Sequence, residues 1–322
     1  MKLNIKKNTI IHTLNDTYIA YIHSRPSKKI KTPYLGDCDV YTHEDNKKNN
    51  NITKLSKLKK CEKLNVINND VLVHLPSLGT CGLTESGKFI IVTPKNTKAK
   101  SKYLTQLTYI TKPNTIIGVN PILANEIVHN MLKNNILKFI GTTDLIKPES
   151  TFGNSRIDFM VKKGDKTIYI EVKNVPLADH YDLSKVELKK LLKNDDFSKE
   201  YEKNIKKYNQ KTAIFPDGYR KDKNAPVSER AVKHFDELIK IAALENHEAY
   251  LFYIIQRKDI NSFSPSRLDK IYRDKFMEAV EKGVKIVPIS VYWERDENCI
   301  NKYNCIINKI IKVKYTNYPD IE

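Results

Sequence analysis

The 322-residue sequence lacks any run of about 18 consecutive apolar residues, so it predicts no membrane-spanning helix and no membrane partner. It also lacks a secretory-signal pattern, because Met1-Lys2-Leu3 is followed by polar residues rather than by a continuous apolar segment. Cysteine is scarce: the five cysteines are an odd number without C-x-x-C spacing, which favours a reduced intracellular compartment such as the cytoplasm, nucleus or nucleoid. Irregular spacing favours ordinary thiols over a zinc site at Cys38, His43 and Cys61. A single tryptophan leaves no evident aromatic platform for a sugar.

Basic residues are what the sequence has in excess. The net charge is +18, and most of the excess lies in residues 1–135. A basic surface neutralises phosphates and releases counterions, so this charge favours nucleic-acid binding without specifying a sequence. The abundance of lysine, asparagine and isoleucine also indicates a coding bias, which would raise the isoelectric point whatever the function. Within the basic half, we predict DNA contacts from Lys95, Lys98, Lys100 and Lys102.

The most informative stretch is residues 155–173, which carries the pattern D-x12-E-x-K. Apolar and polar residues alternate on both sides of Lys163-Gly164-Asp165, so the stretch predicts two half-buried strands joined by a hairpin turn. The apolar alternation fixes the parity of the pairing, because a slip of one residue would turn the polar side chains into the core. This register places Asp158, Glu171 and Lys173 on one face of the hairpin.

Two carboxylates beside an ammonium group suit metal-dependent phosphate chemistry. Mg²⁺ prefers oxygen ligands and is usually held by one or two carboxylates together with substrate phosphate. We therefore predict Asp158 and Glu171 as ligands of Mg²⁺ (or Mn²⁺), with Lys173 orienting a water or stabilising phosphoryl charge. The alternative is a set of cross-strand ion pairs on a solvated sheet face, which such spacing often produces.

Several short blocks occur in a fixed order along the chain: Val119-Asn120, Ala124-Asn125, Glu149, Phe152-Gly153, Ser155-Arg156-Ile157-Asp158-Phe159, Glu171-Val172-Lys173, Phe215-Pro216-Asp217, Arg230 and Lys233-His234. Together they resemble the sugar fermentation stimulation protein (SfsA) family, and the resemblance covers roughly residues 64–293. What the resemblance implies is an α+β protein: an OB-like β-barrel over residues 1–112, then an α/β domain of the PD-(D/E)xK nuclease type over 113–322, with DNA as ligand.

Four further candidates come from these blocks. Glu149 is a candidate third catalytic acid, and a structural salt bridge to Arg156 is the alternative. We also predict DNA contacts from Arg156, Lys233 and His234, and the alternative for His234, which the residues alone slightly favour, is a partly buried polar histidine.

The chain departs from the family pattern by inserted residues. Residues 183–209 are rich in Lys, Glu and Leu at helical spacing and predict a surface helical insertion. Its charges largely offset each other, which is typical of a solvated face, while Leu188, Leu191 and Leu192 predict one packed side. Further insertions are expected over residues 37–63, with a low-complexity run at 46–51, and over 218–228.

Hydrophobic periodicity gives the remaining elements. In the first half we expect strands over residues 8–22, 71–74, 89–92 and 104–110, and a helix over 121–137. In the second half we expect helices over 228–246 and 268–282, the first capped by Ser228. Strands are expected over 250–255 and 284–292, and the first should be covered on both faces because it is continuously apolar.

The sequence therefore predicts a DNA-binding protein with Mg²⁺-dependent phosphodiester hydrolysis. The alternative is a non-catalytic DNA-binding regulator on a nuclease scaffold. The sequence leaves the oligomeric state open, a homodimer included.

Overall fold

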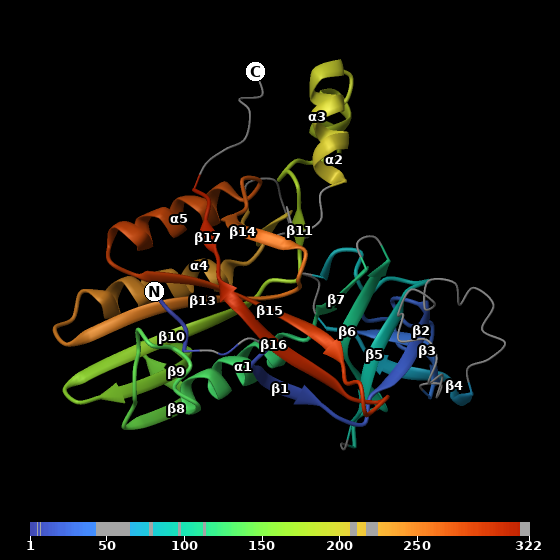
Figure 1. Cartoon of the computed structure of the whole chain (residues 1–322), viewed down its shortest axis with the longest axis horizontal. Coiled ribbons are helices and arrows are strands. Elements are labelled where there is room, and N and C mark those ends of the chain that lie inside the picture. The colour runs from blue at the N-terminus through green and yellow to red at the C-terminus, as the bar shows by residue number, and fades with distance from the viewer. Residues whose placement is uncertain are drawn as a thin grey trace.

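Three β-sheets with helices on both faces of the largest make up the structure (Figure 1). The computed structural model describes residues 1–4, 6, 8–42, 65–76, 80–95, 98–111, 114–206, 211–216 and 225–315. Among these residues, no helix is both long and apolar enough to cross a membrane.

The largest sheet has seven strands. Their order is β1 (Ile10–Leu14), β16 (Tyr303–Ile310), β15 (Lys285–Arg295), β13 (His247–Gln256), β10 (Lys166–Asn174), β9 (Ser155–Lys163) and β8 (Leu145–Phe152). The central strands β10, β13 and β15 run parallel, and the outer pairs are antiparallel. The helices that connect these parallel strands cover one face of the sheet, and a helix that precedes β8 in the chain covers the other.

Helix α1 (Pro121–Lys133) covers one face of this sheet, and α4 (Glu229–Ala242) and α5 (Lys270–Glu281) cover the other (Figure 1). Side chains of β13 alternate between these layers: Tyr250 and Phe252 join the α1 core, whereas Leu251 and Tyr253 join the α4–α5 core. The prediction of a strand covered on both faces is confirmed.

Local capping sets where the helices begin. The Asn120 side chain accepts from the backbone N–H of Ile122, and a proline occupies the first helical position of α1. Ser228 caps α4, as predicted, by accepting from the backbone N–H of Ala231.

The predicted hairpin is present as β9 and β10. Gly164 forms its turn at φ 54°, in the left-handed region that glycine adopts without a Cβ penalty. Pairing of Ile168 with Val161 and of Ile170 with Phe159 places these apolar side chains in the α1 core.

The second sheet has six strands, in the order β4 (Val66–His74), β3 (Leu35–Tyr41), β2 (Tyr18–Ser24), β5 (Phe89–Pro94), β6 (Tyr103–Thr111) and β7 (Asn114–Gly118). An additional parallel pairing joins β4 to β6, with Val73 opposite Tyr103, so the strands β2 to β6 pair in a ring. Buried residues such as Ile22, Val40 and Val92 fill the interior of this ring.

The strand expected over residues 8–22 is two strands in two sheets. A turn at Asp16, with φ 49°, separates β1 from β2, and β1 pairs with β16 in the seven-stranded sheet. The polar run Asn15-Asp16-Thr17 interrupts the apolar residues at this turn, so the sequence carried a turn signal that the single-strand expectation passed over. At the other end, β7 extends the six-stranded sheet immediately before α1. The chain thus places β1 in the seven-stranded sheet before it builds the six-stranded sheet from β2 to β7.

A four-stranded sheet completes the fold beside α4 and α5. Its strand order is β11 (Ala178–Asp179), β12 (Lys211–Phe215), β14 (Ile260–Pro265) and β17 (Lys312–Val313).

The described part of the insertion predicted over residues 183–209 is helical, as predicted, and forms α2 (Lys185–Leu191) and α3 (Asp195–Ile205), which project from the body (Figure 1). Arg267 anchors α2 through a 2.7 Å ion pair with Glu187. The predicted packed side is weak, because Leu188 and Leu191 are only half-buried and Leu192 is exposed.

The insertion expected over residues 37–63 begins inside β3, where Asp37 is buried and accepts a hydrogen bond from the Ser27 hydroxyl. The low-complexity run at 46–51, together with His43 and Cys61, lies outside the described residues, as do residues 218–224.

Candidate functional site

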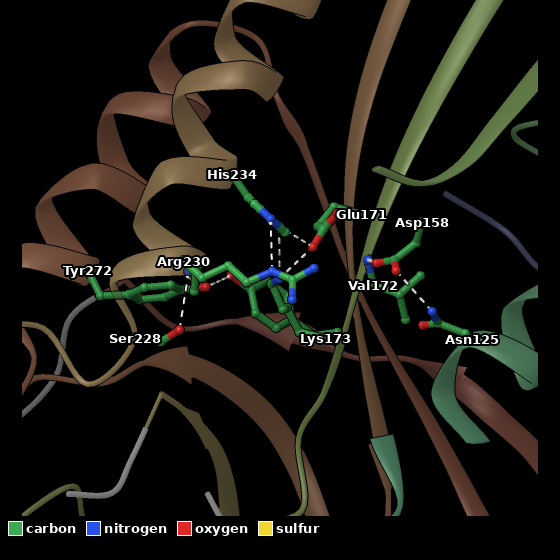
Figure 2. Close-up of polar contacts among 11 residues, drawn as sticks. Asn125, Asp158, Glu171, Val172, Lys173, Ser228, Arg230, His234 and Tyr272 are labelled. Atoms are coloured by element: carbon green, nitrogen blue, oxygen red, sulfur yellow. Dashed lines mark hydrogen bonds and ion pairs between the residues drawn. The ribbon is translucent and has the colours of Figure 1, made fainter. Parts of the chain in front are cut away.

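The two carboxylates predicted from the hairpin lie where β9 and β10 diverge. Backbone pairing between these strands extends from Lys166–Lys163 to Ile170–Phe159. Beyond it, the Asp158 side chain takes the place of a backbone partner: its Oδ2 accepts from the Val172 N–H at 2.7 Å. Its Oδ1 accepts from Asn125 Nδ2, on α1, at 2.9 Å. These two bonds fix the Asp158 carboxylate at the edge of β10 (Figure 2).

Glu171 lies on the side of β10 that faces α4. Lys173 Nζ donates to Glu171 Oε1 at 2.5 Å, and His234 Nδ1 of α4 bonds the same oxygen (Figure 2). The Glu171 side chain is only 3% exposed, yet its second oxygen, Oε2, has no hydrogen-bond partner among the described residues. A buried carboxylate oxygen without a partner is unusual, because desolvation then goes uncompensated.

The expectation that all three groups share one face is therefore met only in part. Glu171 and Lys173 face α4, whereas the Asp158 carboxylate is drawn to the Val172 backbone and to Asn125 of α1 (Figure 2). Period-two alternation assumes that both strands stay paired, and here β9 leaves its partner at Asp158.

Electrostatics distinguish the two acids. Burial, followed by the charge of Glu171, raises the pKa of Asp158 above its usual value, against the opposing bond from the Val172 N–H. Burial would also raise the pKa of Glu171, but the Lys173 ammonium and the contact with His234 outweigh it and lower that pKa. Repulsion between these two neighbouring carboxylates, one buried and one half-buried, is what a bound cation would relieve.

A cavity of about 880 Å³ opens over these groups. Asp158, Glu171, Lys173 and His234 line it together with Asn125. The first turn of α4 contributes Arg230, whose Nε lies 3.4 Å from His234 Nε2. Tyr34 and Thr80 reach the same cavity from the segments that flank the strands of the six-stranded sheet. The cavity thus has walls from both large sheets.

The donor set fits a hard divalent cation. No cluster of three His, Cys, Asp or Glu side chains with metal-binding geometry occurs in the described part of the chain. Mg²⁺, however, needs only one or two protein carboxylates when water and substrate phosphate complete its coordination. Asp158 and Glu171 supply these, and the unpartnered Oε2 of Glu171 is an available oxygen ligand.

The other predicted site residues lie apart from the cavity. Glu149 and Arg156 form a 3.4 Å ion pair with side chains 65% and 60% exposed, the alternative named above for Glu149. Exposed pairs of this kind contribute little stability. Lys233 points into a separate groove with Lys240 and Glu278, although its neighbour His234 lines the cavity.

The four predicted DNA-binding lysines, which we call the basic loop (Lys95, Lys98, Lys100 and Lys102), connect β5 to β6. Three of them are exposed, and Lys95 is half-buried. None is among the residues that line the cavity.

Sequence reasoning missed Asn125 and Arg230 as site residues. Both stood in the motif blocks, and Arg230 precedes His234 by four positions, the spacing that brings two side chains to one helix face. Tyr34 gave no signal, because its place at the cavity depends on how the two sheets meet.

Fold and site together define a mixed α/β protein with one buried carboxylate, one half-buried carboxylate and a lysine at an open cavity. The model of the "Sugar fermentation stimulation protein RE domain" family matches residues 122–185 and 194–297, and the unmatched residues between these blocks lie in and just after α2. The chain belongs to the sugar fermentation stimulation protein family.

Curated relatives agree with this assignment. A sugar fermentation stimulation protein homolog of Pelagibacter ubique is 30% identical over 241 residues, covering 74% of this chain and 87% of its own. The homolog of Clostridium beijerinckii is 30% identical over 241 residues, covering 74% and 88%. That of Desulfotalea psychrophila is 29% identical over 217 residues, covering 67% and 75%.

One solved structure has the same fold: SfsA of Pyrococcus furiosus, determined in complex with Ca²⁺. It superposes with a TM-score of 0.64 at 16% identity, over 95% of this chain and 99% of the other.

Proposed function

We propose that this protein hydrolyses DNA phosphodiester bonds with a divalent metal ion held by Asp158 and Glu171. The observation that carries the proposal is the buried Glu171 Oε2 without a partner, beside the half-buried carboxylate of Asp158 and Lys173 at one open cavity. An ordinary sheet-surface ion pair would be solvated on both oxygens and would need no cavity.

Each residue has a distinct role in this proposal. Asn125 and the Val172 N–H hold the Asp158 carboxylate, and His234 holds that of Glu171, so both acids are fixed before substrate binds. Lys173, hydrogen-bonded to Glu171, orients the attacking water or offsets charge on the phosphoryl oxygens. The metal ion, when bound, supplies Lewis-acid stabilisation of the phosphate and a water of lowered pKa.

Mg²⁺ or Mn²⁺ is the ion that we propose for catalysis. Both suit carboxylate and water ligands, and oxygen sites of this kind also accept Ca²⁺, the ion in the Pyrococcus furiosus structure. Residues 113–322 would then act as a PD-(D/E)xK nuclease-like domain.

The ring of strands β2 to β6 supports a DNA-binding role for the amino-terminal part. Following the ring, the pairing order is β2–β3–β4–β6–β5 and back to β2. We propose that this ring is an OB-like barrel, a five-stranded fold that binds oligonucleotides through its strands and loops.

A cleavage screen tests the proposal. Purified protein is incubated with single-stranded, duplex and branched DNA in Mg²⁺, Mn²⁺ or EDTA, and we expect cleavage in either metal and none in EDTA. DNA binding without cleavage in any metal would favour the non-catalytic regulator instead. Neither binding nor cleavage would contradict both.

The basic loop should contribute electrostatically to DNA binding. Replacing all four lysines with glutamine should weaken binding about equally for all sequences and lower the slope of log affinity against log salt, because fewer counterions are released. Fluorescence anisotropy over a salt series measures this slope. As control, the same replacement at Lys189, Lys190 and Lys193, in and beside α2, should leave it unchanged. An unaltered slope in the basic-loop variant would place the DNA surface elsewhere.

A further inference from the structure

Tyr34 is a cavity-lining residue that comes from the β2–β6 part of the fold. It immediately precedes β3, at the end of the β2–β3 connection, and its side chain belongs to the cavity lining together with Lys173 and Arg230. The residue is 46% exposed, so much of its surface is open to solvent.

The backbone around Tyr34 is held in place while its ring stays accessible. The Tyr34 carbonyl accepts from the Leu75 N–H at 2.9 Å, and Arg25 Nε donates to the preceding Pro33 carbonyl at 3.0 Å. These bonds tie the end of the β2–β3 connection to Leu75, just after β4, and to Arg25, at the start of the same connection. The ring is therefore presented from a fixed backbone, so binding would require little ordering of it.

The basic loop lies at the same end of β4. Lys102 N–H donates to the Leu72 carbonyl at 3.0 Å, and Lys95 N–H donates to the Lys102 carbonyl at 2.9 Å. Leu72 is three residues from Leu75, which bonds Tyr34, so the basic loop and the tyrosine are attached to one short segment. His74 lies between Leu72 and Leu75 in the sequence. Burial first, and then the charge of Lys95, lower its pKa, consistent with the basic loop lying close to this segment.

We propose that Tyr34 stacks on an unpaired base of a DNA strand that runs from the catalytic cavity, over the tyrosine ring, to the basic loop. The substrate class is therefore single-stranded DNA, or a duplex with a single-stranded segment. This inference rests on the proposed nuclease function and adds to it the form of DNA that the site accepts.

The accessible faces of the bases and the charge of the surrounding side chains both favour a single strand. Inside a duplex both faces of a base are covered by its neighbours, so only an unpaired base can offer one to an exposed ring. An aromatic platform followed by a basic track is how proteins hold single strands without reading sequence. Here the cations occur at both ends, with Lys173 and Arg230 in the cavity and the basic loop beyond Tyr34.

The test measures binding separately from cleavage. Binding of a short single-stranded oligonucleotide containing 2-aminopurine is followed in EDTA by fluorescence, which falls when the base stacks. Loss of one base–aromatic stack should weaken binding of Tyr34→Ala by about 10-fold and remove most of the quenching. Tyr34→Phe should retain both, since it keeps the ring. Binding of a blunt duplex should change little in either variant.

Tyr315→Ala is the matched control, because Tyr315 is similarly exposed, at 42%, and does not line the cavity. It should bind like wild type, and equal thermal unfolding midpoints would exclude a folding defect as the cause of any difference. Wild-type affinity and quenching in Tyr34→Ala would overturn the inference. So would an equal loss of duplex and single-strand binding, which would make Tyr34 a general contact. If either of these results is obtained while the wild-type protein still cleaves DNA with a metal ion, the inference is wrong and the proposed function stands.

Discussion

Asp158→Ala and Glu171→Gln should each lower Mg²⁺-dependent DNA cleavage by more than about 100-fold. Removal of a metal carboxylate removes several kcal/mol of transition-state stabilisation, and each 1.36 kcal/mol is tenfold in rate. DNA affinity in EDTA should change little, because neither acid attracts phosphate without its cation. Lys173→Ala should also slow cleavage but should spare Mg²⁺ binding, measured by calorimetry.

Asp236→Asn serves as the control for these variants. Asp236 is a half-exposed acid on α4 whose partner is Lys275, 2.7 Å away, outside the cavity. Cleavage that persists undiminished in both Asp158→Ala and Glu171→Gln would remove this site from consideration. Glu149→Gln decides between the two roles of Glu149: a loss comparable to that of the acids would show a catalytic part despite its exposed pairing with Arg156.

Gly118→Ala should destabilise the fold by about 3 kcal/mol, because the glycine faces a fully buried glutamine. A Cβ at Gly118 would lie 2.0 Å from Gln256 Oε1 and 2.4 Å from its Cδ. Gln256 is not free to move: its Oε1 accepts from Trp293 Nε1 and its Nε2 donates to Asn174 Oδ1, each at 2.9 Å. The substitution must therefore displace backbone or break a buried network that joins β7 to the seven-stranded sheet.

Urea unfolding gives this free energy, with Gly164→Ala for comparison. Gly164 has φ 54° and no atom within 4 Å of an added Cβ, so its replacement tests backbone strain alone, about 1 kcal/mol. If Gly118→Ala lowers the free energy of unfolding no more than Gly164→Ala does, the side chains around Gln256 can rearrange at little cost.

Local patterns predicted the elements well where the chain stays in one environment. The hairpin at Gly164, the Ser228 cap and the double-faced strand β13 all follow from periods and turn residues within about ten positions. The two carboxylates were found for the same reason, since one hairpin carries both.

Long-range pairing lies beyond such patterns. No local signal assigns β1 to β16, because its partner residues lie nearly a chain length away, as in the pairing of Ile10 with Ile306. The direction of the Asp158 carboxylate depends on a strand divergence, and the position of Tyr34 depends on how two sheets meet. These are properties of the assembled fold, which alternation along one strand does not encode.

The pairing of β1 with β16 has a consequence for synthesis on the ribosome. Strand β1 leaves the ribosome long before β16, so its pairing edge must wait for nearly three hundred further residues. Until then the seven-stranded sheet lacks the neighbour that β1 needs, and unpaired edges promote aggregation. Ile10 of β1 is exposed even in the finished fold, so this strand presents an apolar side chain to solvent. We therefore expect nascent chains truncated between residues 111 and 303 to depend on chaperones, although the ring of β2 to β6 is already complete in them.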